Sequence, residues 1–292
     1  MSTAVKTWRI LDILKVTEAA FAEKGIKNPR LNAELLLAET TGESRFSLYL
    51  NFEKPLTESE VSDYREKVKR RLKHEPLQYI LGKAGFYGMD LMVNPSVLIP
   101  RQETEILVEK VLEYIKSSNT VRPKILEIGT GSGCISAAVA ANCECSVTAI
   151  DISSEAVELA KENAALNNLN GKVQFITRDF FDPALTFKGY DIIISNPPYI
   201  SAADVPGLNE EVNAYEPYIA LTDSGDGLSF YKRIFELYNG SVNKPAVFLE
   251  IGDGKKENIV KLLSESNISE YNIHLDLIKL PRVLEINSKA KQ

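Results

Sequence analysis

"KILEIGTGSGCISAAVAA", residues 124–141, predicts a strand that runs into a glycine-rich turn and then directly into a helix. Both ends of this stretch are apolar, and three glycines separate them. The same alternation of strand and helix continues on either side of it. Further strands are predicted at 146–151, 172–177, 190–195 and 246–252, and further helices at 103–118, 153–167 and 228–239. Strands that alternate with helices favour a parallel sheet with helices on both faces.

The end of the chain breaks this alternation. Residues 272–280 and 282–286 are predicted to be two strands, and no helix is predicted between them. An antiparallel edge on an otherwise parallel sheet fits this pattern. The predicted fold class is therefore α/β, with a doubly wound, mostly parallel, Rossmann-like sheet and an antiparallel C-terminal strand.

The chain before residue 84 is predicted to be helical throughout. Asn28 and Pro29 would cap and open one helix, and Gly42 would end it. Thr57 and Glu60 have the spacing of a capping box at the start of another helix.

A β-hairpin is predicted after the helices, with two short strands about a turn at Asn94–Pro95. We therefore expect a helical domain at 1–83, a hairpin connector at 84–100 and an α/β domain at 101–292. The helical domain contains no catalytic cluster, so its expected task is to hold or recognise a partner.

The composition argues against several classes of protein. The 292 residues are 44% hydrophobic and 25% charged, which is typical of a soluble globular chain. The net charge of −6 argues against a protein that wraps nucleic acid. The chain offers neither a membrane span nor the apolar core of a signal peptide, and its three cysteines and two histidines suggest neither disulfides nor a zinc site. We expect a cytoplasmic protein, a monomer, without a metal.

The glycine-rich turn lies where ligands bind in such sheets, beyond the carboxyl end of a strand. Gly129, Gly131 and Gly133 permit a tight turn and a close approach of the backbone to a ligand. A dinucleotide fingerprint would need glycine at 134 or 136, but these positions hold Cys134 and Ser136. A P-loop would need a lysine after Gly133, and none follows.

Acidic side chains accompany three successive predicted strands. Glu127 precedes the first glycine by two residues, and Asp151 ends the next strand, where a carboxylate commonly accepts from ribose hydroxyls. Asp179 and Phe180 follow the third strand, where they could bind the amino group and cover the ring of an adenine. Each carboxylate alone could instead cap a helix. Together they indicate a nucleoside site without a phosphate cradle, which fits S-adenosylmethionine better than NAD or ATP.

The fourth strand ends in a stiff elbow, Asn196-Pro197-Pro198-Tyr199. Prolines cannot continue a strand, because their φ is fixed and they lack an N–H. The side-chain carbonyl of Asn196 and the backbone carbonyl of Pro197 offer two fixed acceptors for the two hydrogens of a planar NH₂ group. Tyr199 could stack on the π-face of that group. The elbow is therefore predicted to bind the NH₂ group of a carboxamide or of an exocyclic base amine.

A nucleoside site beside such an NH₂-binding elbow predicts transfer of a methyl group from the sulfonium of S-adenosylmethionine to nitrogen. An amide nitrogen is a poor nucleophile, but positioning can supply ~7–11 kcal/mol of a barrier. Acceptors aimed at the charge growing on nitrogen add electrostatic stabilisation. We assign catalysis to Asn196, Pro197 and Tyr199, and substrate binding to the same residues with Pro198.

These motifs resemble those of class I S-adenosylmethionine-dependent methyltransferases, and more closely the PrmC/HemK family of release factor glutamine methyltransferases. "EIGTGSG", "NPPY" and the segments "PLQYILGKAGFYGMDLMVNPSVLIPRQETEILVE" and "YEPYIALTDSGDGLSFY" carry the resemblance, which covers nearly the whole chain. It implies methylation of the glutamine in the Gly-Gly-Gln loop of class 1 peptide chain release factors, with S-adenosylhomocysteine as the product, and a substrate-recognition role for the helical domain. It also implies that the cofactor contacts Gly129, Thr130, Gly131, Ser132, Gly133, Asp151, Phe180 and Asn196.

Three alternatives remain open on the sequence. The elbow would hold an adenine amino group equally well, so methylation of nucleic acid is the first alternative, although no basic recognition module accompanies it. A glutamine of a ribosomal protein is the second alternative substrate. A non-catalytic module that binds the cofactor is the third, but such a module has no use for the elbow.

Overall fold

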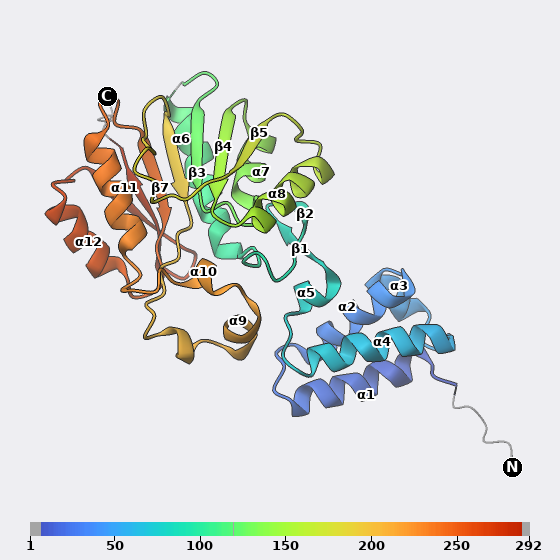
Figure 1. Ribbon diagram of the computed structural model, residues 1–292. Coiled ribbons are helices and arrows are strands. Elements are labelled where there is room, and N and C mark those ends of the chain that lie inside the picture. Colours follow the sequence, from blue (N-terminus) through green and yellow to red (C-terminus); the bar gives the residue numbers. More distant parts are fainter. Residues whose placement is uncertain (1–6, 119, 288–292) are drawn as a thin grey trace, which may run out of the picture. The chain divides into compact units, whose positions relative to one another are not determined.

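The computed structural model describes residues 7–118 and 120–287, which divide into two compact units (Figure 1). The first unit comprises the described residues up to Gly82 together with Glu210–Tyr215. The second comprises the remaining described residues from Lys83 onward. Among the described residues, no helix is both long enough and apolar enough to cross a bilayer.

The first unit is entirely helical. Its helices are α1 (Ile10–Glu23), α2 (Pro29–Thr41), α3 (Arg45–Leu50), α4 (Glu58–Arg71), α5 (Leu77–Leu81) and α9 (Glu210–Tyr215). One apolar core joins α1 to α5, and its fully buried side chains include Leu14, Phe21, Leu36, Leu48 and Tyr64, whereas α9 buries no side chain.

The helix boundaries in this unit follow the predicted signals, with one correction. Thr57 and Glu60 form the predicted capping box, and Gly42 ends α2 in the left-handed conformation. Asn28 precedes α2 with Pro29 at its first position, but the Asn28 side chain caps nothing. Its own φ of 50° turns its side chain away from the role that the sequence predicted.

The short helix α9 comes from a distant part of the chain and is fastened to this unit by polar contacts. Arg71 binds Glu211 at 2.6 Å and Asn32 at 2.7 Å, and Tyr215 donates its hydroxyl to the backbone of Lys73 at 2.7 Å. Arg71 is buried, and it also donates to the backbone carbonyl oxygen of Glu75 at 2.9 Å, so its three partners offset the cost of burying its charge. The helix after the proline elbow therefore belongs to the helical unit, which the sequence did not indicate.

The second unit opens with a hairpin of β1 (Lys83–Phe86) and β2 (Met89–Met92), paired antiparallel. The hairpin turn is Tyr87–Gly88, both with positive φ, and not Asn94–Pro95 as predicted. Asn94 instead starts a turn after β2, where its side chain accepts from the backbone N–H of Ser96 at 2.9 Å. The prediction was wrong because both pairs of residues favour turns, and only pairing across the strands decides which pair joins them.

A mixed sheet of seven strands forms the centre of the second unit, in the order β5-β4-β3-β6-β7-β9-β8 (Figure 1). The first five strands in this order are parallel to one another. Strand β9 runs antiparallel to β7, and β8 runs antiparallel to β9. The strand bounds are β3 (Lys124–Ile128), β4 (Ser146–Asp151), β5 (Val173–Thr177), β6 (Ile192–Ser195), β7 (Ala246–Glu250), β8 (Tyr271–Leu275) and β9 (Pro281–Ile286). The predicted class, mostly parallel with an antiparallel C-terminal edge, is confirmed.

Helices cover both faces of this sheet, as Figure 1 shows. One face packs against α6 (Glu105–Ser118), α7 (Cys134–Asn142) and α8 (Ser154–Leu166). The other packs against α11 (Ser229–Gly240) and α12 (Lys256–Glu265), of which α12 was not predicted. The short helices η1 (Gln102–Thr104), η2 (Val205–Gly207) and α10 (Tyr218–Leu221) lie in the connections.

The strand order places a switch point between β3 and β6. The chain proceeds from β3 outward to β4 and β5, and then returns to build β6 and β7 on the other side of β3. Connections that leave in opposite directions open a crevice at the carboxyl ends of the two central strands, which is where ligands bind in such sheets.

Candidate active site

The glycine-rich turn and the proline elbow both begin at the switch point. Ile128 ends β3, Ser195 ends β6, and the two residues pair in register. The Ser195 hydroxyl also donates to the Ile128 carbonyl oxygen at 2.8 Å. Gly129 and Asn196 follow directly, so the two motifs that are distant in sequence emerge side by side.

Backbone hydrogen bonds to the neighbouring strand hold the glycine-rich turn. The N–H groups of Gly129 and Thr130 both donate to the carbonyl oxygen of Ile150, at 2.9 and 3.0 Å. Gly133 has a φ of 78°, and a Cβ there would lie 2.9 Å from the Cβ of Ala160. A side chain at Gly133 would therefore push the turn away from α8.

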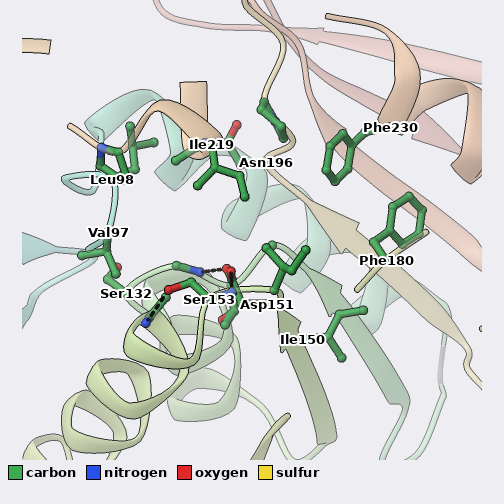
Figure 2. Close-up of a pocket in the computed structure, with 18 of the residues that line it drawn as sticks. Val97, Leu98, Ser132, Ile150, Asp151, Ser153, Phe180, Asn196, Ile219 and Phe230 are labelled. Carbon is green, nitrogen blue, oxygen red and sulfur yellow. Dashed lines mark hydrogen bonds between the residues drawn. The ribbon is translucent and has the colours of Figure 1, made fainter. Parts of the chain in front are cut away.

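Asp151 lies at the end of β4 and faces the crevice (Figure 2). One carboxylate oxygen accepts from the N–H of Gly131 at 2.8 Å, and the other from the N–H of Ser153 at 3.0 Å. Each carboxylate oxygen has a second lone pair that can accept from a ribose hydroxyl. The carboxylate thus links the glycine-rich turn to a potential ligand.

Glu127 lies beneath the turn, almost fully buried, and is not among the residues that line the cavity. It accepts from the hydroxyl of Thr130 at 2.8 Å and from the hydroxyl of Ser136, while its Oε1 atom has no hydrogen-bond partner among the described residues. Burial raises the pKa of Glu127 to about 8, and the charge of Asp151 adds to the shift. The carboxyl group supports the turn from below.

A cavity of about 640 Å³ opens over the turn and lies entirely within the second unit. Such a volume is within the range of small-molecule sites. Nine of the residues assigned from the sequence line it, namely Gly129, Thr130, Gly131, Ser132, Asp151, Asp179, Phe180, Asn196 and Pro198. Glu127, Gly133, Pro197 and Tyr199 do not line it.

An aromatic wall closes one side of the cavity. Phe180 stacks on Phe230 of α11, with ring centroids 5.5 Å apart and planes inclined by 15°. Figure 2 shows both side chains at the edge of the cavity. Asp179 accepts from the N–H of Phe181 at 2.8 Å, and Phe181 packs edge-on against Phe230. Phe230 was not assigned from the sequence, because it lies 50 positions from Phe180 in a helix whose aromatic residues could equally face the core.

Polar contacts hold the amide of Asn196, which also lines the cavity. Its Nδ2 atom donates to the Thr104 hydroxyl at 3.3 Å, and that hydroxyl donates to Glu250 Oε2 at 2.6 Å. Thr104 and Glu250 are both 2% exposed. Burial raises the pKa of Glu250 to about 7. Neither Thr104 nor Glu250 was assigned from the sequence.

The rest of the elbow packs into the protein. The ring of Tyr199 lies against Gly252, where a Cβ would be 2.3 Å from the Tyr199 Cδ2 atom. The backbone of Tyr199 passes equally close to Gly227, where a Cβ would be 2.2 Å from the Tyr199 carbonyl oxygen. Burial, with the nearby carboxylate of Glu250, raises the pKa of Tyr199 well above its usual value. Two glycines thus allow the elbow to sit against its neighbours.

Arg101 also lines the cavity, and its guanidinium pairs with the buried carboxylate of Glu216. This ion pair fixes the chain just before α10, whose Tyr218 and Ile219 line the cavity as well. In the part of the chain that the structure describes, no group of three His, Cys, Asp or Glu side chains could hold a metal ion.

The site meets the chemical requirements of S-adenosylmethionine. Asp151 can accept from ribose hydroxyls, the aromatic wall can cover an adenine, and the turn offers a close approach without a phosphate cradle. Fold and site together define a class I methyltransferase that depends on S-adenosylmethionine. The families described as "PrmC N-terminal domain" and "Methyltransferase small domain" match residues 12–82 and 102–211.

Curated relatives identify the family within this class. The release factor glutamine methyltransferase of Chlorobaculum tepidum is 38% identical over 96% of this chain and 97% of its own length. That of Geobacter sulfurreducens is 39% identical over 92% and 93%, and that of Bacillus subtilis is 42% identical over 78% and 79%. The chain belongs to the release factor glutamine methyltransferase family.

Solved structures show the same fold at low sequence identity. The hMettl16 catalytic domain, solved in complex with MAT2A 3'UTR hairpin 1, superposes with a TM-score of 0.57 and covers 93% of this chain and 92% of that chain. The identity is 16%, so this likeness supports the fold alone.

Proposed function

We propose that this protein transfers a methyl group from S-adenosylmethionine to the side-chain amide nitrogen of the glutamine in the Gly-Gly-Gln loop of a class 1 release factor. The observation that supports the proposal is the pairing of Ile128 with Ser195, which brings the glycine-rich turn and the proline elbow to one crevice. Relatives that span nearly the whole chain carry the corresponding name.

The bound cofactor supplies an electrophilic methyl carbon next to a positively charged sulfur. Asp151 and the glycine-rich turn hold the nucleoside part, and the wall of Phe180 and Phe230 covers its base. Held in this way, the cofactor would present its methyl group at a fixed place in the crevice, and such positioning lowers the barrier to transfer.

The elbow orients the nucleophile. The Asn196 side-chain oxygen and the Pro197 backbone oxygen accept the two N–H bonds of the target carboxamide, so that the nitrogen lone pair points at the methyl carbon. The nitrogen–carbon bond forms as the carbon–sulfur bond breaks, and the positive charge passes to nitrogen until a proton leaves. Both oxygens carry partial negative charge and stabilise that nitrogen as its charge grows.

We assign recognition of the release factor to the helical domain, residues 1–83, with residues 84–100 as the connector to the catalytic domain at 101–292. The match of residues 12–82 to the PrmC N-terminal domain supports this assignment. The net charge of −6 supports a protein substrate in preference to a nucleic acid. We propose that the protein works as a monomer, which light scattering of the purified chain would test.

The decisive experiment incubates the purified protein and labelled S-adenosylmethionine with a full-length release factor. We expect one added methyl group on the glutamine of the Gly-Gly-Gln peptide, located by mass spectrometry, and none on a release factor in which that glutamine is alanine. Label on RNA, DNA or a ribosomal protein, with none on the release factor, would replace this function with one of the alternative substrates.

A further inference from the structure

The Thr104 hydroxyl lies between two side chains that come from different strands. It accepts from Asn196 Nδ2 at 3.3 Å, and it donates to Glu250 Oε2 at 2.6 Å. Asn196 follows β6 and Glu250 ends the neighbouring strand β7. Thr104 itself belongs to η1, about 90 positions before Asn196. The three side chains form a short chain of hydrogen bonds that the proposed mechanism does not yet use.

The chemistry of the three groups fixes the direction of this chain when Glu250 is ionised. A carboxylate only accepts hydrogen bonds, so the single proton of the Thr104 hydroxyl points at Glu250. The lone pairs of the hydroxyl oxygen then remain for Asn196, which must offer its NH₂ end. The amide oxygen of Asn196 is left over, and no described residue donates to it.

We propose that Thr104, oriented by Glu250, is a positioning residue that fixes the amide of Asn196 with its oxygen toward the substrate. This rests on the proposed function, in which that oxygen accepts an N–H of the target carboxamide. In the flipped orientation Asn196 would present its own NH₂ to the NH₂ of the substrate, and two donors cannot bond. An amide that turned freely would spend much of its time in that unproductive state.

The surroundings hold Glu250 in place for this task. Its backbone carbonyl accepts from the Tyr231 hydroxyl at 2.6 Å, and the residue pairs with Val283 of β9. Its carboxylate is faced by Thr104 and Glu103 of η1, by Tyr199 of the elbow and by Arg282 of β9. Because the carboxylate is rigid and almost fully buried, the orientation it imposes is set before the substrate arrives.

The test compares Thr104→Val with Thr104→Ser in the full chain. Valine keeps the shape and removes the hydroxyl, so we expect kcat for release-factor methylation to fall by about tenfold to hundredfold. Because Thr104 acts through Asn196, the dissociation constant of S-adenosylmethionine should stay within about twofold of the wild-type value. Serine restores the hydroxyl and should return kcat to within about threefold of the wild-type value.

A double-mutant cycle separates positioning from general damage. If Thr104 works only through Asn196, then Thr104→Val should lower kcat no further in an Asn196→Ala background. Thr148→Val, at a half-buried threonine of β4 that does not line the cavity, is the control for loss of a threonine hydroxyl and should leave kcat unchanged. Additive effects of the two substitutions, or wild-type kcat in Thr104→Val, would overturn the proposal.

A second readout does not depend on the substrate. The side-chain amide of Asn196, assigned by its loss in Asn196→Asp, should give two well-separated proton resonances in the NMR spectrum of the wild-type protein. Thr104→Val should move them toward the positions of a solvent-exposed asparagine, and Thr104→Ser should not. If the release factor proves not to be the substrate but this pattern holds, the positioning inference stands while the proposed function fails. Unchanged resonances in Thr104→Val would contradict the inference whatever the substrate.

Discussion

Ser195 donates its hydroxyl to the carbonyl oxygen of Ile128 at 2.8 Å, at the point where β6 and β3 both end. The bond ties together the last residues of two strands that are 67 positions apart in the chain. The residues that follow them, Asn196 and Gly129, start the elbow and the turn. The turn proposed to bind the cofactor and the elbow proposed to bind the amide thus begin at one point of the sheet.

Asn196→Ala should abolish most turnover and leave cofactor binding nearly intact. The substitution removes one of the two acceptors for the target carboxamide, and loss of one such group typically costs about 10²–10³-fold in kcat. The dissociation constant of S-adenosylmethionine, measured by calorimetry, should change by no more than a few-fold. A variant with normal kcat would show that the elbow does not hold the nucleophile.

Asp151→Asn should weaken cofactor binding by about tenfold to hundredfold, the usual effect of removing a hydrogen bond to a charged group. The carboxylate accepts from the turn and can accept from ribose hydroxyls, whereas the amide has only one oxygen to do both. Asp191→Asn is the matched control, because Asp191 binds the N–H of Lys124 at the other end of the same sheet. Equal affinity of the two variants for S-adenosylmethionine would show that Asp151 does not bind the cofactor.

Gly252→Ala should lower kcat by at least about tenfold, because the new Cβ would lie 2.3 Å from the ring of Tyr199 and shift the elbow. Gly207→Ala is the control, since a Cβ there meets no atom within 4 Å. Turnover and thermal unfolding should both be measured for the two variants. A Gly252→Ala protein as active as Gly207→Ala would mean that the position of Tyr199 is unimportant.

Glu127→Gln should change how stability depends on pH. The folded protein raises the pKa of Glu127 from 4.5 to about 8, so the folded state binds the proton more tightly than the unfolded state. Stability is therefore lost as the pH rises from about 5 to about 8, by up to roughly 4–5 kcal/mol in the free energy of unfolding.

Glutamine does not titrate, so this part of the loss should disappear in the variant. The measurement is the free energy of unfolding in urea at about pH 5 and about pH 8 for the wild-type protein and the variant. The same decrease with pH in both proteins would show that Glu127 is not the group responsible.

The catalytic rate should rise with pH through the pKa of Glu250, which burial raises to about 7. Below that pH the protonated carboxyl group can donate to Thr104, whose proton can then turn to the oxygen of Asn196 and favour the unproductive amide orientation. Glu250→Gln cannot titrate, so its kcat should be flat between about pH 6 and pH 8. A variant that keeps the rise of the wild-type protein would assign the pH dependence to another group.

Much of the site was predictable because it follows local rules of chain geometry. Three glycines in a turn after a strand, and two prolines that stop another, restrict the backbone whatever lies around them. Asp151, Asp179 and Phe180 line the cavity, because the carboxyl ends of parallel strands meet at one edge of a sheet.

Other features depended on contacts between distant segments. Four such features show no local pattern in the sequence. They are the hairpin turn at Tyr87–Gly88, the attachment of α9 through Arg71, the stacking of Phe230 on Phe180 and the contact of Tyr199 with Gly252. Each side chain in these pairs has many possible neighbours, and packing of the whole chain selects one.

The sequence by itself determined the class of fold, the cofactor turn and the amide-binding elbow, because backbone restriction and strand order act through residues close in the chain. Only the tertiary structure brought Thr104 and Glu250 next to Asn196, and with them the proposed orientation of its amide. The physical reason is that a hydrogen bond has a donor and an acceptor. The buried carboxylate of Glu250 sets the direction of the bond from the Thr104 hydroxyl, and only the folded sheet brings Glu250 close to Thr104.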